Sequence, residues 1–198
     1  MQPVPSVSGT AVPLDRSDVD TDQIIPSEWL KRVERTGFGQ GLFAEWRDDR
    51  DFVLNQPQFA GATILVAGAN FGVGSSREHA VWALVDYGFQ AVISPRFGEI
   101  FRNNASKSGL VPVQVEPDVG QALRDAVRSD PGTEITVDVG RLTVSAPAAG
   151  IEAPFVLDPA IQHRLLEGLD DVALTLQHAS DIGGFEGHRP SWLPDATG

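Results

Sequence analysis

Thr63-Ile-Leu-Val-Ala67, followed by Gly68-Ala-Asn-Phe-Gly-Val-Gly-Ser-Ser-Arg-Glu-His-Ala80, is the stretch that decides the fold of this 198-residue chain. An apolar run passes into a glycine-rich turn and then into residues 76–87, which have a helical pattern and end before Gly88. Ala91-Val-Ile-Ser94 follows as a second apolar run. This order predicts a strand–helix–strand unit, whose two strands should be parallel and joined by a right-handed crossover.

The flanking sequence extends this unit into an α/β domain. Upstream we expect a strand at 9–13, an acidic loop at 15–25 and a short helix capped by Ser27 and running through Val33. Downstream the pattern predicts helices at 97–107, 119–128, 159–168 and 172–182, and antiparallel strands at 134–139, 141–146 and 153–157. It also predicts a strand at 110–115, in which Pro112 suggests an edge position or a bend. We therefore expect one domain spanning residues 1–198, with a mainly parallel sheet, a small antiparallel layer, outer helices and a flexible tail at 183–198.

Composition limits the classes of function. The net charge of −12 argues against general nucleic-acid binding, which favours a basic surface. The chain has no cysteine, so it forms no disulfide, thiolate nucleophile or cysteine-ligated iron–sulfur cluster of its own. We read no signal peptide and no apolar run of membrane-spanning length, and we expect a cytoplasmic protein. The histidines show no metal-ligand spacing, so we expect no metal site.

The glycine-rich loop has the chemistry of an anion site. A strand that passes through such a turn into a helix leaves free backbone N–H groups at the helix N-terminus, where the dipole favours negative charge. Ser75, Ser76 and Arg77 lie at that point. A P-loop would need a lysine before the serine, and the dinucleotide fingerprint would need glycine where Arg77 stands. A stand-alone anion- or nucleotide-binding module nevertheless remains an alternative.

Ser75 also has a structural interpretation. Ser75 and Glu78 have the spacing of a capping box at the start of a helix. The two interpretations are compatible, because a hydroxyl that faces helix N–H groups is one whose alkoxide would be stabilised. A serine could act as a base only in such an environment.

Two loops upstream carry further candidates. Asp18, Asp20 and Asp22 begin like a calcium-binding loop, but Gln23 and Trp29 stand where that loop needs glycine and glutamate. An aspartate-rich turn and helix cap is the simpler interpretation. Residues 36–41 contain three glycines, which favour a mobile loop.

Several motifs together resemble one family. Besides the glycine-rich loop, they are Val12-Pro-Leu-Asp15, Asp18-Val-Asp-Thr-Asp-Gln-Ile-Ile-Pro26, Arg35-Thr-Gly-Phe-Gly39, Trp82-Ala-Leu-Val-Asp-Tyr-Gly-Phe89, Phe97-Gly-Glu-Ile-Phe101 and Leu174-Thr-Leu-Gln-His178. They resemble the swivelling domain of the aconitase superfamily, in the form found in the small subunits of bacterial 3-isopropylmalate dehydratases. The resemblance extends from about residue 10 to residue 182.

The resemblance implies a β/β/α swivelling fold and a hydro-lyase of leucine biosynthesis. It implies a partner, the large subunit, which carries a [4Fe–4S] cluster, while this chain itself binds no cofactor. The substrate would be isopropylmalate. Ser75 would be the catalytic base, Asp22 would orient the base or the substrate, and Ser76 and Arg77 would hold a substrate carboxylate.

The same resemblance places substrate specificity in residues 29–41. Leu30 stands where relatives that act on citrate or homocitrate carry an arginine, and a leucine suits an isopropyl group. Arg32 and Arg35 are further candidates for substrate binding. A homoaconitase or methylmalate-type small subunit therefore remains an alternative.

Overall fold

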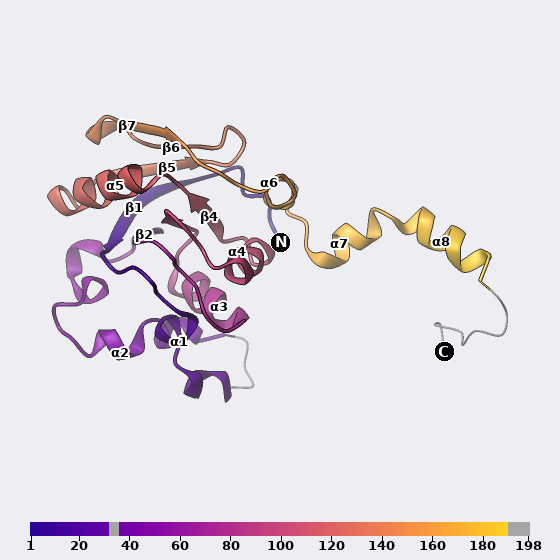
Figure 1. Cartoon of the computed structure of the whole chain (residues 1–198), viewed down its shortest axis with the longest axis horizontal. Coiled ribbons are helices and arrows are strands. Elements are labelled where there is room, and N and C mark those ends of the chain that lie inside the picture. Colours follow the sequence, from indigo (N-terminus) through magenta and orange to yellow (C-terminus); the bar gives the residue numbers. More distant parts are fainter. Residues whose placement is uncertain (32–35, 190–198) are drawn as a thin grey trace.

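The computed structural model describes residues 1–31 and 36–189, and a seven-stranded mixed sheet forms its centre (Figure 1). The strand order is β4-β3-β2-β1-β5-β6-β7. The parallel half consists of β1 (Ser6–Leu14), β2 (Ile64–Ala67), β3 (Ala91–Ser94) and β4 (Val111–Gln114). The antiparallel half adds β5 (Glu134–Asp138), β6 (Thr143–Ala146) and β7 (Ile151–Pro154). The predicted α/β class and the position of β4 at an edge are both confirmed.

Strand β1 joins the two halves. Its residues 11–14 pair in parallel with β2, whereas residues 6–10 pair antiparallel with β5. The antiparallel strands therefore extend the main sheet instead of stacking on it as a separate layer. The strand is longer than the predicted residues 9–13, because its first half alternates small polar residues with Val7 and lacks the continuous apolar run of β2 and β3.

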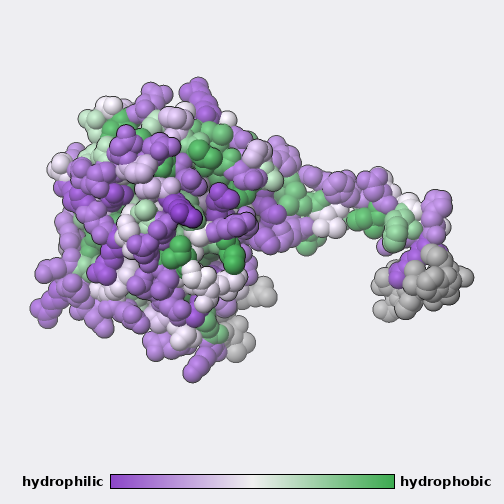
Figure 2. Space-filling model, viewed as in Figure 1, coloured by the Kyte–Doolittle hydropathy of each residue, from purple (hydrophilic) through white to green (hydrophobic). Residues whose placement is uncertain are grey.

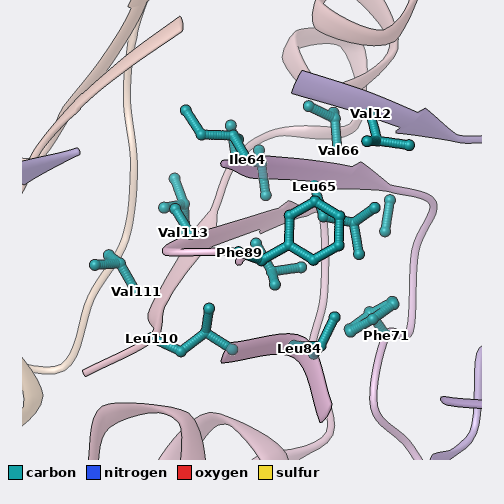
Figure 3. Packing of buried hydrophobic residues seen from close by; sticks show 14 of the residues in the cluster. Val12, Ile64, Leu65, Val66, Phe71, Leu84, Phe89, Leu110, Val111 and Val113 are labelled. Atoms are coloured by element: carbon teal, nitrogen blue, oxygen red, sulfur yellow. The ribbon is translucent and has the colours of Figure 1, made fainter. Parts of the chain in front are cut away.

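Helices cover both faces of the parallel half. Helices α3 (Glu78–Tyr87) and α4 (Glu99–Lys107) pack together on one face, and α5 (Pro117–Ser129) contacts β1, β2 and β3 from the other (Figure 1). All four residues of β2 and of β3 are buried, as expected for parallel strands covered on both sides. Figure 3 shows the β2 side chains Ile64, Leu65 and Val66 in one cluster with Phe71, Leu84, Phe89 and Leu110.

Short elements connect β1 to β2. They are α1 (Thr21–Ile24), α2 (Ala44–Arg47) and four 3₁₀ helices, at Ser27–Lys31, Phe38–Gly41, Val53–Asn55 and Pro57–Phe59. The helix predicted to start after Ser27 is a 3₁₀ helix that includes this residue, and its predicted end at Val33 lies outside the described residues.

Residues 38–41 form a packed 3₁₀ helix, Phe38–Gly41, where the three glycines suggested an open loop. Phe38, Gly39 and Gly41 are buried. A Cβ atom on Gly39 would lie 2.8 Å from the backbone nitrogen of Tyr87, and one on Gly41 would lie 2.4 Å from the Trp29 ring. Both glycines therefore permit close packing.

The C-terminal region contains α6 (Pro159–Glu167), α7 (Asp171–Leu176) and α8 (Ala179–Gly187). The helix predicted over 172–182 is divided between α7 and α8. Residues 183–187, expected in the tail, belong to α8. Helices α7 and α8 form an arm that projects from the body (Figure 1). Within the described residues, no helix has the length and apolar character needed to cross a membrane.

Candidate active site

Two loops that leave the carboxyl ends of β1 and β2 run side by side. The backbone N–H of Gly68 donates to the Arg16 carbonyl (3.0 Å), that of Gly72 to Val19 (2.8 Å), and that of Thr21 to Val73 (3.0 Å). These bonds continue the parallel pairing of the two strands beyond the sheet. They bring the acidic loop next to the glycine-rich loop.

A third loop, which follows β3, completes the platform. The Phe71 N–H donates to the Arg96 carbonyl and the Gly98 N–H donates to the Phe71 carbonyl, both at 2.9 Å. Gly72 has a φ of +71°, and a Cβ atom there would lie 2.3 Å from the Phe101 ring. The position therefore requires glycine on both conformational and steric grounds. Ligands of open parallel sheets bind at this carboxyl edge.

Two of the three aspartates in the acidic loop have structural roles. Asp18 accepts a hydrogen bond from the Asn70 side chain at 2.6 Å, which links the two loops. Asp20 caps α1: its carboxylate accepts from the Gln23 N–H (2.7 Å), and the Gln23 side chain accepts from the Asp20 N–H (3.0 Å). The predicted turn and cap are confirmed for these two residues. The Asp22 carboxylate takes part in neither and instead faces Arg77.

Asp22 forms an ion pair with Arg77. Next to it, the Thr21 hydroxyl donates to the Ser75 carbonyl at 2.9 Å across 54 residues of sequence. The Arg77 side chain is 17% exposed and that of Asp22 is 52% exposed, so the pair lies at the edge of a solvent-accessible site. Ser75 and Ser76 are both exposed. The structure thus brings together Asp22, Ser75, Ser76 and Arg77, four of the predicted site residues.

The predicted capping box is wrong. Helix α3 begins at Glu78 and not at Ser76, and Arg77 is its N-cap without a side-chain cap bond. The Thr21 bond holds the Ser75 carbonyl beside α1, and the backbone of Arg77 is extended before the helix starts. In the described part of the chain, the hydroxyls of Ser75 and Ser76 form no hydrogen bond, and both residues shortly precede the N-terminus of α3, where negative charge is favoured.

The predicted specificity residues are only partly placed. Leu30 lies in the 3₁₀ helix Ser27–Lys31, shortly after α1, and is half-buried. Arg32 and Arg35 lie outside the described residues. The role of all three remains a prediction.

Arg124 of α5 is a supporting residue that the sequence analysis missed. Its guanidinium donates to the carbonyl of Ala67, the last residue of β2, at 2.8 Å, and it pairs with Asp15, which follows β1, at 3.0 Å. Burial lowers the pKa of Arg124 below its ordinary value. The arginine joins the ends of the two strands from which both site loops start. The sequence signal that could have found it is the place of this arginine directly after Leu123 and three residues before Val127, on the apolar side of α5.

Two family models match separate parts of the chain. Residues 1–118 match the model described as the aconitase C-terminal domain. Residues 171–194 match the model described as the C-terminal domain of the 3-isopropylmalate dehydratase small subunit.

Similar proteins cover nearly the whole chain. The 3-isopropylmalate dehydratase small subunits of Frankia alni and Rubrobacter xylanophilus are 63% and 56% identical to it, over 96% and 98% of both chains. That of a Parafrankia species is 64% identical over 94% of this chain and 95% of its own. A crystal structure of 3-isopropylmalate dehydratase from Methanocaldococcus jannaschii superposes with a TM-score of 0.68 at 26% identity, over 92% of this chain and 99% of that one. The chain therefore belongs to the family of 3-isopropylmalate dehydratase small subunits, built on the aconitase C-terminal domain.

Proposed function

We propose that this chain supplies the proton-transferring and carboxylate-binding half of an active site that interconverts 2- and 3-isopropylmalate by reversible dehydration. Its family is that of the small subunit of a hydro-lyase in leucine biosynthesis. The observation that carries the proposal is the convergence of Asp22, Ser75 and Arg77 at the carboxyl edge of the parallel strands. The cytoplasmic location expected from the sequence is part of this proposal.

Ser75 is the base in this proposal. A proton on the carbon next to a carboxylate is barely acidic, so its removal requires a positioned base and stabilisation of the resulting anion. The Ser75 hydroxyl is exposed, and its backbone is fixed by Thr21. The N-terminus of α3 and the Arg77 guanidinium favour its alkoxide form.

Arg77 and Ser76 bind a substrate carboxylate in the same scheme. A guanidinium presents several N–H donors in a planar fork, so one edge can pair with Asp22 while another receives the substrate. Asp22 then acts through Arg77, by holding it in position, instead of orienting the base directly.

The second half of the site must come from another chain. Hydroxide is a poor leaving group, and a Lewis acid on the hydroxyl would assist its departure. A [4Fe–4S] cluster is held by cysteine thiolates, and this chain has no cysteine, so its donor set does not fit the cluster. The name "small subunit" implies a large partner. We assign the cluster to this large subunit.

Leu30 supports isopropylmalate over a substrate with an additional carboxylate. It offers an apolar side chain in the segment that follows α1, whereas an extra carboxylate would require a cation.

Titration of the chain into its cognate large subunit tests the proposal. We expect no turnover by either chain alone, saturable dehydration of isopropylmalate by the mixture, and little or no turnover of homocitrate. Turnover by this chain alone, or a preference of the mixture for homocitrate, would contradict the proposal.

A further inference from the structure

The C-terminal arm, residues 170–189, is attached to the body only at its base. Asp171 pairs with Lys107 of α4 and with Arg164 of α6, at 2.9 and 2.7 Å. Leu174 lines a cavity between these two helices. All hydrogen bonds and ion pairs made by the described residues 177–189 join residues of the arm itself. The arm is therefore fixed where it leaves the body and has no polar contact with the body farther out.

The arm exposes large apolar side chains. The exposed fractions are 67% for Val172, 65% for Leu176, 39% for Ile182 and 72% for Phe185. Figure 2 shows hydrophobic patches at several places along the arm, separated by hydrophilic surface. A monomeric protein rarely leaves such a series of apolar residues in water, and a series of this kind marks an interaction surface.

The helices of the arm are too weak to stand alone. Helix α7 has 6 residues and α8 has 9, whereas isolated helices shorter than about 12–15 residues are marginal in water. Helix α8 also contains Gly183 and Gly184 in its interior, each of which costs about 1 kcal/mol relative to alanine, and it ends at Gly187. A Cβ atom added to any of these glycines would meet nothing within 4 Å, so close packing does not require glycine there. The arm therefore has the energetics of a segment that gains its stability from another surface.

Two observations favour the large subunit as that surface. Residues 171–189 of the arm fall within the match to the model for small subunits, whereas the match to the aconitase domain model ends at residue 118. The arm thus matches a model made for small subunits, the form of this domain that must associate non-covalently. Charge disfavours a second copy: the whole chain carries −12, and the charged side chains of the arm are Asp170, Asp171, Asp181, Glu186 and Arg189.

We propose that the arm is the docking element of this subunit. Its apolar residues enter an apolar groove with a basic rim on the large subunit, and Asp171 fixes the direction in which the arm reaches the partner. This inference rests on the proposed function, because that function supplies the partner. Phe185 and Leu176 are its expected anchors, since they combine large apolar surfaces with high exposure.

The test compares the Leu176→Ser/Phe185→Ser double variant with Val156→Ser, which changes an apolar residue of the body that is 64% exposed. We expect the double variant to bind the cognate large subunit at least about 30-fold more weakly, as loss of a hot-spot side chain does. The Tm of the free chain and the kcat at saturating large subunit should stay unchanged. Val156→Ser should bind like wild type.

Hydrogen exchange gives a second readout that needs no variant. Amides of α8 should exchange fast in the free chain and become protected in the complex. Wild-type affinity of the double variant, or unprotected α8 amides in an active complex, would overturn the inference while leaving the proposed function intact. An arm-dependent homodimer whose disruption leaves affinity for the large subunit unchanged would assign the arm to a second copy. A wild-type mixture without turnover would instead overturn the proposed function, and the inference with it.

Discussion

Arg77 is the guanidinium that we propose binds a substrate carboxylate, and its position depends on Asp22. Replacement by lysine keeps the charge but removes the planar, two-pronged contact. Arg77→Lys should therefore lower kcat/KM by about 10–100-fold, the loss expected for one charge-assisted hydrogen bond. Its Tm should stay within about 2 °C of wild type. Steady-state kinetics of the reconstituted enzyme checks this, with Arg141→Lys, at an 84% exposed side chain, as the control. An unchanged kcat/KM would remove Arg77 from the site.

Gly72 tests the close approach of the glycine-rich loop to α4. Gly72→Ala should destabilise the chain by about 2–5 kcal/mol, because it combines a left-handed backbone with a collision against Phe101. Gly61→Ala is the matched control: its φ of +77° is similar, but nothing lies within 4 Å of its Cβ position. It should cost only the backbone strain, about 1–2 kcal/mol. Urea unfolding of both variants measures the difference, and equal losses would show that Phe101 yields without cost.

The residues of the site differ in how far the sequence predicted them. Ser75, Ser76 and Arg77 are adjacent in one loop, so a local pattern was enough to group them. The role of Asp22 was expected from family resemblance, but its contact with Arg77 depends on the pairing of two distant loops. Arg124 contacts Ala67 across 57 residues, and no local pattern reports such a contact.

At the level of elements, local signals predicted where helices exist better than where they begin. Helix α3 starts two residues later than expected, because Thr21 holds the Ser75 carbonyl and competes with the capping box. The region 172–182 has a helical pattern, but it divides between α7 and α8 at Gln177 and His178.

The base of the arm should respond to acid. Hydrogen bonds from Lys107 and then Arg164 lower the pKa of Asp171 below its ordinary value of 3.8. The ionised form is therefore favoured by folding, and its contribution is present above pH 3.8 and lost as the pH falls through the lower folded-state pKa. Because the side chain is 57% exposed, the contribution should be only about 0.2–1 kcal/mol.

Urea unfolding of Asp171→Asn over a range of pH checks this. The variant should be less stable than wild type near neutral pH, and the difference should vanish well below pH 3.8. Asp181→Asn is the control, because it removes another exposed carboxylate of the arm, 82% exposed, and leaves both ion pairs of Asp171 in place. A difference that persists unchanged in acid would mean that the ion pairs do not cause it.

At the scale of the whole molecule, the sheet was predicted well where strands are continuous apolar runs. The parallel unit of β2, α3 and β3 follows directly from residues 63–94. The full length of β1 was not predicted, because its two halves pair with different strands and its first half lacks a strong apolar pattern.

The packing of residues 38–43 gives a prediction for the free chain. The Gly39 N–H donates to the Asp86 carboxylate at 3.0 Å, and the Phe43 N–H donates to the Ile24 carbonyl at 2.8 Å. Both residues are buried. Their amides should therefore exchange slowly without the large subunit, close to the rates of β2. Exchange as fast as that of α8 would show that this segment is mobile in the free chain, as its glycines suggested.

The assignment of Ser75 as the base is the central claim, and one variant tests it directly. In the complex with the large subunit, Ser75→Ala should lower kcat by about 10²–10⁴-fold, the contribution of a positioned base. Affinity for the large subunit and the Tm should be unchanged, because the hydroxyl caps no helix. Ser129→Ala, at an exposed serine at the end of α5, should retain full activity. A Ser75→Ala complex with a kcat within about twofold of wild type would contradict the assignment.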